Sequence, residues 1–375
     1  MEICEQAKTV ATELVDLVEK PAEQDLRELN FHCLKRFAAA GLMDFGFLSD
    51  GRLASGDVRK GVNITQAIAE RSGTLASIFL VNAFFGGAAV AFMGSERQKS
   101  SILPRLQAGK LQLAFALTEP HAGSDAASIT TRAEARDGRY LLNGEKIYTT
   151  GASVADEILV VAKTGSETEH SRAMSVFLVP QNAAGLTIEP LKKLAGNAHP
   201  SCRVVLDDVS VAADQLLGET EGLGTAGANL RLTGALERLM VAAICVGTAK
   251  RILEDALAFS REREQFGQRI CEFQSISHTL VEMATSYKIM KLLVNDATKA
   301  VESNRDATEE VCMAKYYCAE QLQIMVANGM RILGGRAYFS DSAMSRIYRE
   351  TPLALYAGGT IELHKNILAR ILDLT

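Results

Sequence analysis

The chain has 375 residues, of which 47% are hydrophobic and 23% charged, and its formal net charge is −5. This length exceeds what one ordinary hydrophobic core organises, so two or three packed units are expected. The mildly acidic balance gives no support to binding of nucleic acid or of an anionic membrane surface. No window has the uninterrupted apolar length of a membrane helix, and the first twenty residues have an amphipathic pattern in place of a secretory signal.

Seven cysteines are scattered along the chain, and no two of them have CxxC spacing. An odd number without paired spacing favours reduced thiols in a cytoplasmic protein over a disulfide framework or a zinc site. The six histidines form no HxxxH pair, so a metal site is not expected.

The first part of the chain has helical periodicity. Residues 77–94, SIFLVNAFFGGAAVAFMG, have the composition of a buried helix. Ser95 is expected to cap the next helix, which stops at Gly109. The pattern predicts an N-terminal α-helical domain over residues 1–111.

Residues 112–217 have the texture of β-structure. Short runs rich in β-branched and aromatic residues are separated by turn signals, of which Asp137-Gly138 and Asn143-Gly144 are the strongest. Their number and length predict a small central barrel or sandwich domain.

Long helical patterns return in residues 218–375. They cover 230–265, 272–303 and 307–333, and a shorter helix begins near Thr360. Long helices joined by short loops predict a C-terminal four-helix bundle. The fold class expected for the whole chain is therefore multi-domain α+β.

Four short sequences are candidate binding elements. FALTEPHAGSD (115–125) ends a strand in a turn whose amides and Ser124 hydroxyl suit a phosphate. REREQFGQRICEFQ (261–274), RILGGRAY (331–338) and YAGGTIEL (356–363) place arginines or glycines at helix ends, where anions and carbonyls bind. Taken singly, the first three also fit a plain strand-to-loop turn, a helix hairpin with a solvated arginine, and a helix C-cap.

The chain resembles the acyl-CoA dehydrogenase family over almost its whole length, because it contains, in this order, TEPxAGSD, RxxFGxxI…Q, a GG pair and GGTxE. The resemblance implies FAD as the cofactor, an acyl thioester as the substrate and an electron-transferring flavoprotein as the acceptor. It also implies a homo-oligomer, a dimer or a tetramer, in which each FAD touches two subunits.

The resemblance assigns roles to individual residues. Matches along the flavin and its pyrophosphate in the central domain are Phe115, Leu117, Thr118, Gly123, Ser124, Tyr148 and Thr150. Matches that reach the FAD of the neighbouring subunit are Arg263, Phe266 and Gln274. The other cofactor-binding matches are Arg331, Gly334, Gly335, Thr360 and Glu362. Substrate contacts are implied for Ser124, Arg238, Gly358 and Gly359.

The catalytic base of many family members is a glutamate in a C-terminal YEGT sequence, but that position is Gly358 here. The isovaleryl and long-chain branches place the base in an ERL sequence on a bundle helix, and GALERL matches it at Glu237. Apolar residues share the helical face of Glu237, and desolvation there raises a carboxyl pKa toward the pH at which it acts as a base. The alternative is a buried Glu237–Arg238 ion pair that locks helices together.

Two departures from the family pattern concern the binding of FAD. The family's QxxGGxG reads RILGGRA here, so Arg331 replaces a glutamine and Ala337 a glycine. An arginine accepts no hydrogen bond, so we expect it to reach a phosphate or ribose of an adjacent subunit's FAD instead. The PEExGG loop usual in the N-terminal domain is also absent.

The implied reaction is α,β-dehydrogenation of an acyl thioester, in fatty acid or amino acid catabolism. Glu237 removes the α-proton, the β-hydride passes to flavin N5, and a ribityl hydroxyl with the amide of Gly358 or Gly359 polarises the carbonyl. Ala357 opens space beside the base and Phe84 and Phe85 close it, which favours a short or branched acyl group. Alternatives on this fold are an enoyl-thioester reductase, a carrier-protein acyl dehydrogenase, a flavin oxidase or monooxygenase, and a non-catalytic FAD-binding protein.

Overall fold

A computed structural model describes residues 2–20, 25–47, 52–54, 56–165, 173–303 and 305–374, without the side chains of 228–232. The chain divides into two compact units. The bundle unit comprises Met1–Thr12, Val58–Ala76 and Glu237–Thr375, and the sheet unit comprises Glu13–Asp57 and Ser77–Leu236. The domain boundaries expected at residues 111 and 217 stay a prediction.

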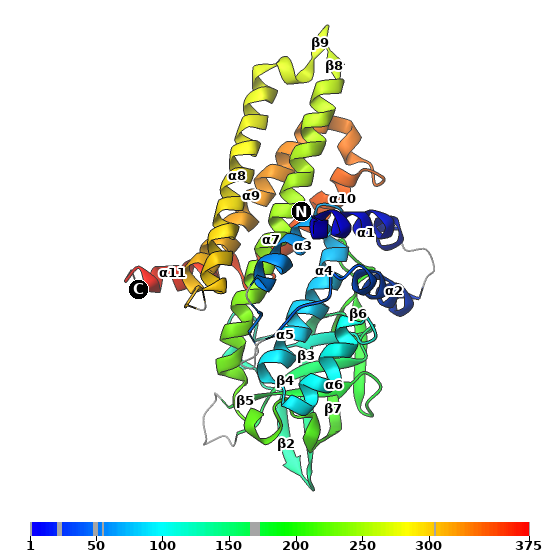
Figure 1. Cartoon of the computed structure of the whole chain (residues 1–375), viewed down its shortest axis with the longest axis vertical. Helices are drawn as coiled ribbons and strands as arrows, with labels where there is room; N and C mark the ends of the chain where they lie inside the picture. The colour runs from blue at the N-terminus through cyan, green and yellow to red at the C-terminus, as the bar shows by residue number, and fades with distance from the viewer. Residues whose placement is uncertain are drawn as a thin grey trace. The chain divides into compact units, whose positions relative to one another are not determined.

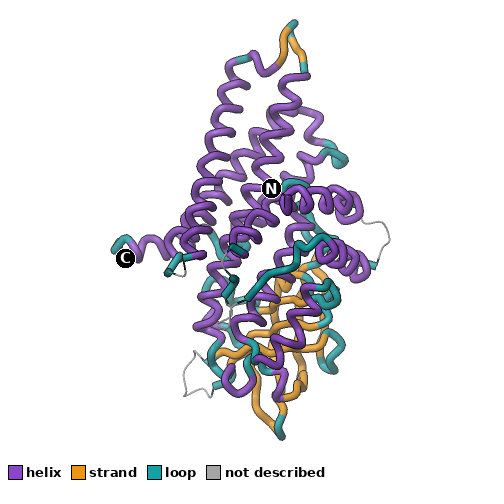
Figure 2. Tube along the Cα trace, in the orientation of Figure 1, coloured by secondary structure: helices purple, strands orange, loops and turns teal. Residues whose placement is uncertain are grey.

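The sheet unit contains a curled sheet (Figure 2). Its strands are β1 (Leu113–Ala116), β2 (Arg132–Arg136), β3 (Arg139–Thr150), β4 (Glu157–Lys163), β5 (Met174–Pro180), β6 (Leu186–Leu191) and β7 (Ser201–Ala212). Within the described ranges the order is β1-β4-β2-β3-β7-β6, and β5 pairs with β4. Strand β1 runs parallel to β4, whereas the β2–β3, β3–β7, β6–β7 and β4–β5 pairs are antiparallel.

Strand β4 is buried on both faces, which explains its continuous apolar run. Ile158 and Val160 point into a core built within the sheet. Leu159 and Val161 point to the opposite face, where they join a core that includes Ile102. The helices of this unit are α2 (Leu26–Ala39), α5 (Gly87–Met93) and α6 (Glu96–Gln107).

One of the two predicted tight turns is confirmed and the other is wrong. Asp137 and Gly138, with φ of 52° and 73°, form the turn between β2 and β3. Asn143 and Gly144 instead lie inside β3, where the pairing with β7 shifts register. Gly144 is needed there because a Cβ would come within 2.7 Å of the Thr131 Cα.

Helix α6 begins at Ser95, as predicted, with a capping box completed by Gln98. The buried Gln98 amide does more than cap the helix. Its Nε2 donates to the carbonyls of Asp214 and Leu216, both at 2.9 Å, and its Oε1 accepts from the Gly218 amide, also at 2.9 Å. One side chain therefore ties the start of α6 to the segment that follows β7.

The predicted buried helix is continuous with α4 (Gly73–Leu80) through a π-helical turn, η1 (Val81–Gly86), into α5. The Asn82 side chain in this turn donates to the Ile78 carbonyl and accepts from the Leu113 amide of β1. Within the described residues, Gly73–Met93 is one stretch long and apolar enough to span a membrane, with mean hydropathy 2.0. Thr74, Ser77 and Asn82 interrupt this apolar stretch, but such isolated polar residues lower its mean hydropathy too little to exclude it by composition. Since 83% of the window is buried inside the protein, the stretch has the character of a core helix.

The bundle unit holds the long helices (Figure 1). They are α7 (Ala226–Glu262), which begins in the sheet unit, α8 (Gln274–Glu302) and α9 (Thr308–Leu333). The shorter elements are α3 (Asp57–Ala69), β8 (Glu264–Gln265), β9 (Gln268–Arg269), α10 (Ala343–Glu350) and α11 (Ile361–Ile371), and α1 (Glu2–Glu19) begins in this unit and ends in the sheet unit. The first long helix was expected to continue to residue 265, but it ends at Glu262 because the next residues form the β8–β9 hairpin. The expected fold class is confirmed: helical N-terminal region, central sheet and helical C-terminal region.

Candidate active site

Glu237 lies in α7, on a face of the helix that is otherwise apolar in this part of its length. Met240, Val241 and Thr248 on this face are buried. Within the described part of the chain, no hydrogen bond or ion pair involves the Glu237 carboxylate. The Glu237–Arg238 ion pair considered from the sequence is therefore not formed here.

The Glu237 carboxyl is desolvated although part of the side chain is accessible. Burial raises its pKa to about 7, and the charges of Arg238 and Lys315 oppose this rise without cancelling it. Such a group is ionised in a large fraction of molecules near neutral pH yet remains basic, as a general base requires.

The glycine turn of YAGGT packs on the same stretch of α7. Gly358 and Gly359 have φ of 68° and 99°, which favour glycine. A Cβ on Gly358 would lie 3.5 Å from Val241 Cγ2 and 3.7 Å from Arg238 Cγ. The turn therefore packs against Arg238, the residue next to Glu237 in α7, although 121 positions separate Glu237 from Gly358 in the chain.

The amides of the two glycines differ. The Gly359 amide donates to the Tyr356 carbonyl at 3.2 Å. The Gly358 amide has no partner among the described residues. Of the two glycines named from the sequence, Gly358 therefore has the N–H group that is free to bind a carbonyl.

Lys315 of α9 lies beneath this turn and was missed from the sequence. It is fully buried, and its Nζ donates to the carbonyls of Gly359 at 2.6 Å and Leu355 at 3.5 Å. Burial lowers its pKa to about 8, while the nearby Cys245 and Glu237 favour the charged form. The sequence signal that could have indicated its burial is the position of this lysine in the otherwise apolar run VCMAKYYCA.

His364 of α11 is the second buried polar residue near the turn. It is fully buried, and neither ring nitrogen has a hydrogen-bond partner among the described residues. Burial, followed by the positive charges of Lys315 and Arg238, lowers its pKa to about 4. The backbone of Gly358 and Gly359 has a smaller effect that raises the pKa. The imidazole is therefore neutral at physiological pH.

In the sheet unit, TEPHAGSD forms an open turn after β1. Gly123 and Ser124 are exposed, and a Cβ at Gly123 would meet nothing within 4 Å. Their amides donate to no group among the described residues. Free amides and a hydroxyl on an open turn suit a phosphate, so the donor set fits the pyrophosphate of FAD.

Residues at the end of β3 have features that suit contact with the ring system of a flavin. Tyr148 has a φ of 60°, unusual for a non-glycine residue, and 66% of it is exposed. Thr149 Oγ1 is buried without a partner among the described residues, and Thr150 Oγ1 lies 2.9 Å from Ser201 Oγ. Phe115, Leu117 and Thr118 of the preceding strand and loop are half-buried. An exposed aromatic ring held in a strained backbone is a mark of a binding position.

The same loop is held by a buried ion pair that the sequence did not reveal. Glu119 accepts from the amide and hydroxyl of Thr130 at 2.6 and 2.9 Å and from those of Thr131 at 2.9 and 2.6 Å. Lys146 Nζ donates to Glu119 at 2.8 Å and to the Leu117 carbonyl at 3.0 Å. Burial alone would raise the pKa of Glu119, but these hydrogen bonds, led by Lys146, lower it to about 2.

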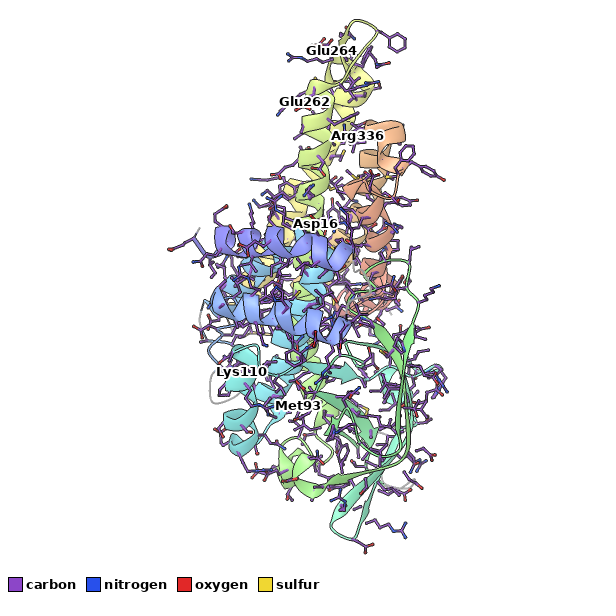
Figure 3. The ribbon with its side chains drawn as sticks, turned by 90° about the vertical axis from the view of Figure 1, so that its right-hand side faces the viewer. Asp16, Met93, Lys110, Glu262, Glu264 and Arg336 are labelled. Carbon is purple, nitrogen blue, oxygen red and sulfur yellow. The ribbon has the colours of Figure 1, made fainter. Side chains whose placement is uncertain are left out.

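Arg263, Phe266 and Gln274 are not brought to Glu237. They lie around the β8–β9 hairpin, where Phe266 is 94% exposed and Gln274 begins α8 as predicted. Since a helix rises about 1.5 Å per residue, Arg263 is about 40 Å from Glu237 along α7. Figure 3 shows Glu262 and Glu264 at this end.

Arg331, Gly334 and Gly335 belong to the same end of the bundle. Arg331 is exposed in the last turn of α9, and Gly334 ends that helix with a φ of 59°. The following Arg336, which is labelled in Figure 3, places its guanidinium 6.0 Å from the ring centre of Phe259 in α7. Thr360 instead caps α11 beside the glycine turn, accepting from the Leu363 amide at 3.1 Å, and Glu362 lies in its first turn.

Other candidate chemistry is sparse in the described residues. No group of three or more His, Cys, Asp or Glu side chains there could hold a metal ion. All seven cysteines are free thiols. A polar cavity of about 210 Å³ between α3 and α8 is lined by Arg59, Lys288 and Lys291 among others, but by none of the predicted site residues.

Two family models match the chain. Residues 225–372 match "Acyl-CoA dehydrogenase, C-terminal domain", and residues 114–209 match "Acyl-CoA dehydrogenase, middle domain". The chain is 31% identical over 345 residues to "Probable acyl-CoA dehydrogenase YngJ" of Bacillus subtilis, covering 92% of this chain and 90% of that protein. It is 32% identical over 372 residues to "Caffeyl-CoA reductase-Etf complex subunit CarC" of Acetobacterium woodii, covering 97% and 94%.

Solved structures give the same result. Butyryl-CoA dehydrogenase from Megasphaera elsdenii superposes with a TM-score of 0.89 at 25% identity, covering 100% of this chain and 98% of that one. A structure described as the FAD complex of PigA superposes with a TM-score of 0.84 at 25% identity, covering 98% and 97%.

Proposed function

Since the chain belongs to the acyl-CoA dehydrogenase family, we propose that it removes hydrogen from the α and β carbons of an acyl-CoA thioester, with Glu237 as the base. Family membership confirms the expected class, an FAD-dependent oxidoreductase acting on acyl-CoA. The observation that carries the residue assignment is the Glu237 carboxylate, which is desolvated, unbonded among the described residues and next to a turn with a free amide.

FAD, when bound, accepts the hydride from the β-carbon. In the proposal, the Gly123–Ser124 turn holds the pyrophosphate, and Phe115, Leu117 and Thr118 flank the flavin. Tyr148 and Thr150 contact its ring system. The free amides and the exposed ring of Tyr148 support this assignment.

The chain's own residues act on the substrate as follows. The Gly358 amide binds the thioester carbonyl, which makes the α-proton more acidic, as donors to a developing oxyanion do. Glu237 takes that proton and becomes a neutral acid in its apolar surroundings, which favour the neutral form. Arg238 and Gly359 complete the wall, and Ser124 is a further proposed substrate contact.

Several finer assignments belong to the same proposal. Residues at the far end of the bundle would reach the FAD of a second subunit in a homo-oligomer, a dimer or tetramer: Arg263, Phe266, Gln274, Arg331, Gly334 and Gly335. Their distance from Glu237 along the helices supports contact with another subunit's cofactor. Thr360 and Glu362 would contact FAD from the start of α11. The domain boundaries 1–111, 112–217 and 218–375 are part of this proposal.

The proposal also covers the cellular context. An electron-transferring flavoprotein is the proposed acceptor, because the relative CarC is named as a subunit of a reductase–Etf complex. A cytoplasmic location is supported by seven free thiols. A short or branched acyl group remains the proposed substrate. Phe84 is buried against Phe45 and Phe79 in the core of the sheet unit, whereas Phe85 is half-buried.

A second candidate is the reverse reaction, reduction of an enoyl-CoA. It is favoured by the CarC match, because that relative is named a reductase. The same base and turn would serve both directions, since proton transfer at the α-carbon is common to them.

One anaerobic experiment tests the function. Purified protein loaded with FAD is mixed with a panel of saturated acyl-CoA thioesters, and the flavin absorbance is followed; a dehydrogenase bleaches with at least one of them. Photoreduced protein mixed with the corresponding enoyl-CoA thioesters reports the reverse reaction. A protein that takes up no FAD, or whose flavin responds to neither series, contradicts the proposal.

A further inference from the structure

The buried Lys315 binds the backbone on both sides of Gly358 in the glycine turn. Its ammonium donates to the carbonyl of Gly359, which follows Gly358, and to that of Leu355, which precedes it. The positive φ values of both glycines make this segment intrinsically permissive, so its path must be fixed by contacts. A charged donor at 2.6 Å is a strong contact of this kind.

The surroundings of Lys315 contain several titratable and charged groups within the bundle unit. From α7 these are Glu237, Arg238 and Cys245, and from the start of α11 they are Glu362 and His364. Glu237 stands out among them, because its carboxylate has no hydrogen bond among the described residues that would stabilise its charge. The positive charges that act on it are therefore those of Arg238 and Lys315.

A buried lysine with this position has two simultaneous effects. Through its hydrogen bonds it sets where the Gly358 amide lies relative to α7. Through its charge it favours the ionised form of Glu237 over the protonated form. A residue serving only as a helix-to-loop anchor would have the first effect without consequence for proton transfer.

We propose that Lys315 is a positioning residue for the reaction: its ammonium fixes the turn that presents the Gly358 amide, and its charge stabilises ionised Glu237. The inference rests on the proposed roles of Glu237 and Gly358. It concerns a residue outside the motifs that define those roles.

The primary variant is Lys315→Met, which keeps the length of the side chain and removes both the charge and the donor. We expect the limiting rate of flavin reduction by a thioester substrate to fall about tenfold or more, with a much smaller change in thioester dissociation constant. The acid limb of the rate profile should move to higher pH by about one unit, because loss of a nearby positive charge raises the pKa of Glu237.

Two further variants separate the two effects. Gly359→Ala strains the turn, since the residue has a φ of 99° and the new Cβ would lie 3.1 Å from Leu363 Cδ2, but it leaves the charge of Lys315 in place. It should lower the rate without moving the acid limb. Lys299→Met removes an exposed lysine from α8 and should change neither quantity.

A measurement independent of turnover keeps the proposal testable. The carboxyl stretch of Glu237 can be titrated by infrared difference between the FAD-loaded wild type and Glu237→Gln, and repeated in the Lys315→Met background. The midpoint should rise when Lys315 is removed. If Lys315→Met fails to fold, Lys315→Arg, which keeps the charge, should retain the wild-type midpoint while lowering the rate through the altered donor position.

The outcomes distinguish this inference from the function itself. If no thioester or enoyl thioester changes the flavin, the proposed function fails, and the infrared titration still decides whether Lys315 acts on Glu237. If the enzyme is active but Lys315→Met or Lys315→Arg leaves both rate and midpoint unchanged, the positioning role is wrong. A lower rate with an unmoved midpoint in Lys315→Met overturns the electrostatic part.

Discussion

The two units of the molecule each contain a glutamate near a fully buried lysine, and the two carboxylates are treated in opposite ways. In the sheet unit, Glu119 and Lys146 are in direct contact at 2.8 Å. In the bundle unit, Glu237 and Lys315 influence each other only through space. Burial lowers the pKa of both lysines to about 8, so the two carboxylates differ in their contact with the lysine and not in the pKa of the lysine itself.

The difference lies in the number of donors around each carboxylate. Glu119 accepts five hydrogen bonds, and its pKa falls to about 2 despite burial. Glu237 accepts none from the described residues, and burial raises its pKa to about 7. A carboxylate that already accepts many hydrogen bonds has no basicity left for chemistry, whereas one that accepts none retains its basicity. Only the second can serve as a base near neutral pH.

The largest expected effect comes from breaking the saturated pair. Glu119→Gln leaves the Lys146 charge buried without its partner and should lower the free energy of unfolding by about 3–5 kcal/mol. Chemical denaturation of the purified variant measures it. Glu254→Gln on the exposed side of α7 is the control and should change stability by less than about 0.5 kcal/mol. A Glu119→Gln protein as stable as wild type would mean that the pair does not hold the loop.

The same substitution at the unsatisfied carboxylate should affect chemistry instead. Glu237→Gln keeps the volume but removes the base, so the rate of flavin reduction by thioester should fall by at least about two orders of magnitude, with FAD retained. Stopped-flow absorbance under anaerobic conditions measures this rate. If the variant reduces its flavin at nearly the wild-type rate, the base lies elsewhere.

Double-mutant cycles on unfolding free energy sharpen the contrast. The coupling between Glu119→Gln and Lys146→Met should be about 1–3 kcal/mol, because the two groups are in contact. For Glu237→Gln and Lys315→Met it should be below about 0.5 kcal/mol at about pH 6, where Glu237 is mostly protonated. Equal coupling energies in the two pairs would show that they are the same kind of interaction.

The pH dependence of stability should have opposite signs for the two carboxylates. Glu119 has a folded pKa of about 2, below the ordinary glutamate value of 4.5, so its contribution is present above about pH 4.5 and is lost as pH falls toward 2. Glu237 has a folded pKa of about 7, so folding favours its protonated form, and stability declines as pH rises from about 4.5 through 7. Unfolding curves of wild type minus each Gln variant across this range isolate the two contributions, and slopes of the same sign would contradict the comparison.

Much of the fold and the residue proposed as the base could be predicted from the sequence. The long helices, the Ser95 cap and the Asp137-Gly138 turn follow from local periodicity and turn chemistry, which depend on neighbours in the chain. The assignment at Glu237 followed from its ERL context and from the coincident loss of a carboxylate at Gly358. Its expected rise in pKa agrees with the structure.

The residues that were missed depend on contacts between distant segments. Asn143-Gly144 has the composition of a turn, but a close approach of Thr131 places it within a strand. Lys146 looks like an ordinary surface residue in the sequence, whereas the apolar neighbours of Lys315 were a signal that was overlooked; the packed structure shows both lysines buried. The orphaned ring of His364 likewise reflects packing that no local pattern encodes.

The buried amide of Gln98 bears on the order in which the chain folds. All of its hydrogen-bonding capacity is used: it completes the cap of α6 locally and binds a segment about 120 residues later in the sequence. Closing so long a loop carries an entropic penalty that early intermediates cannot recover, so these contacts form late. The final anchorage of α6 must therefore wait until residues 214–218 have been synthesised.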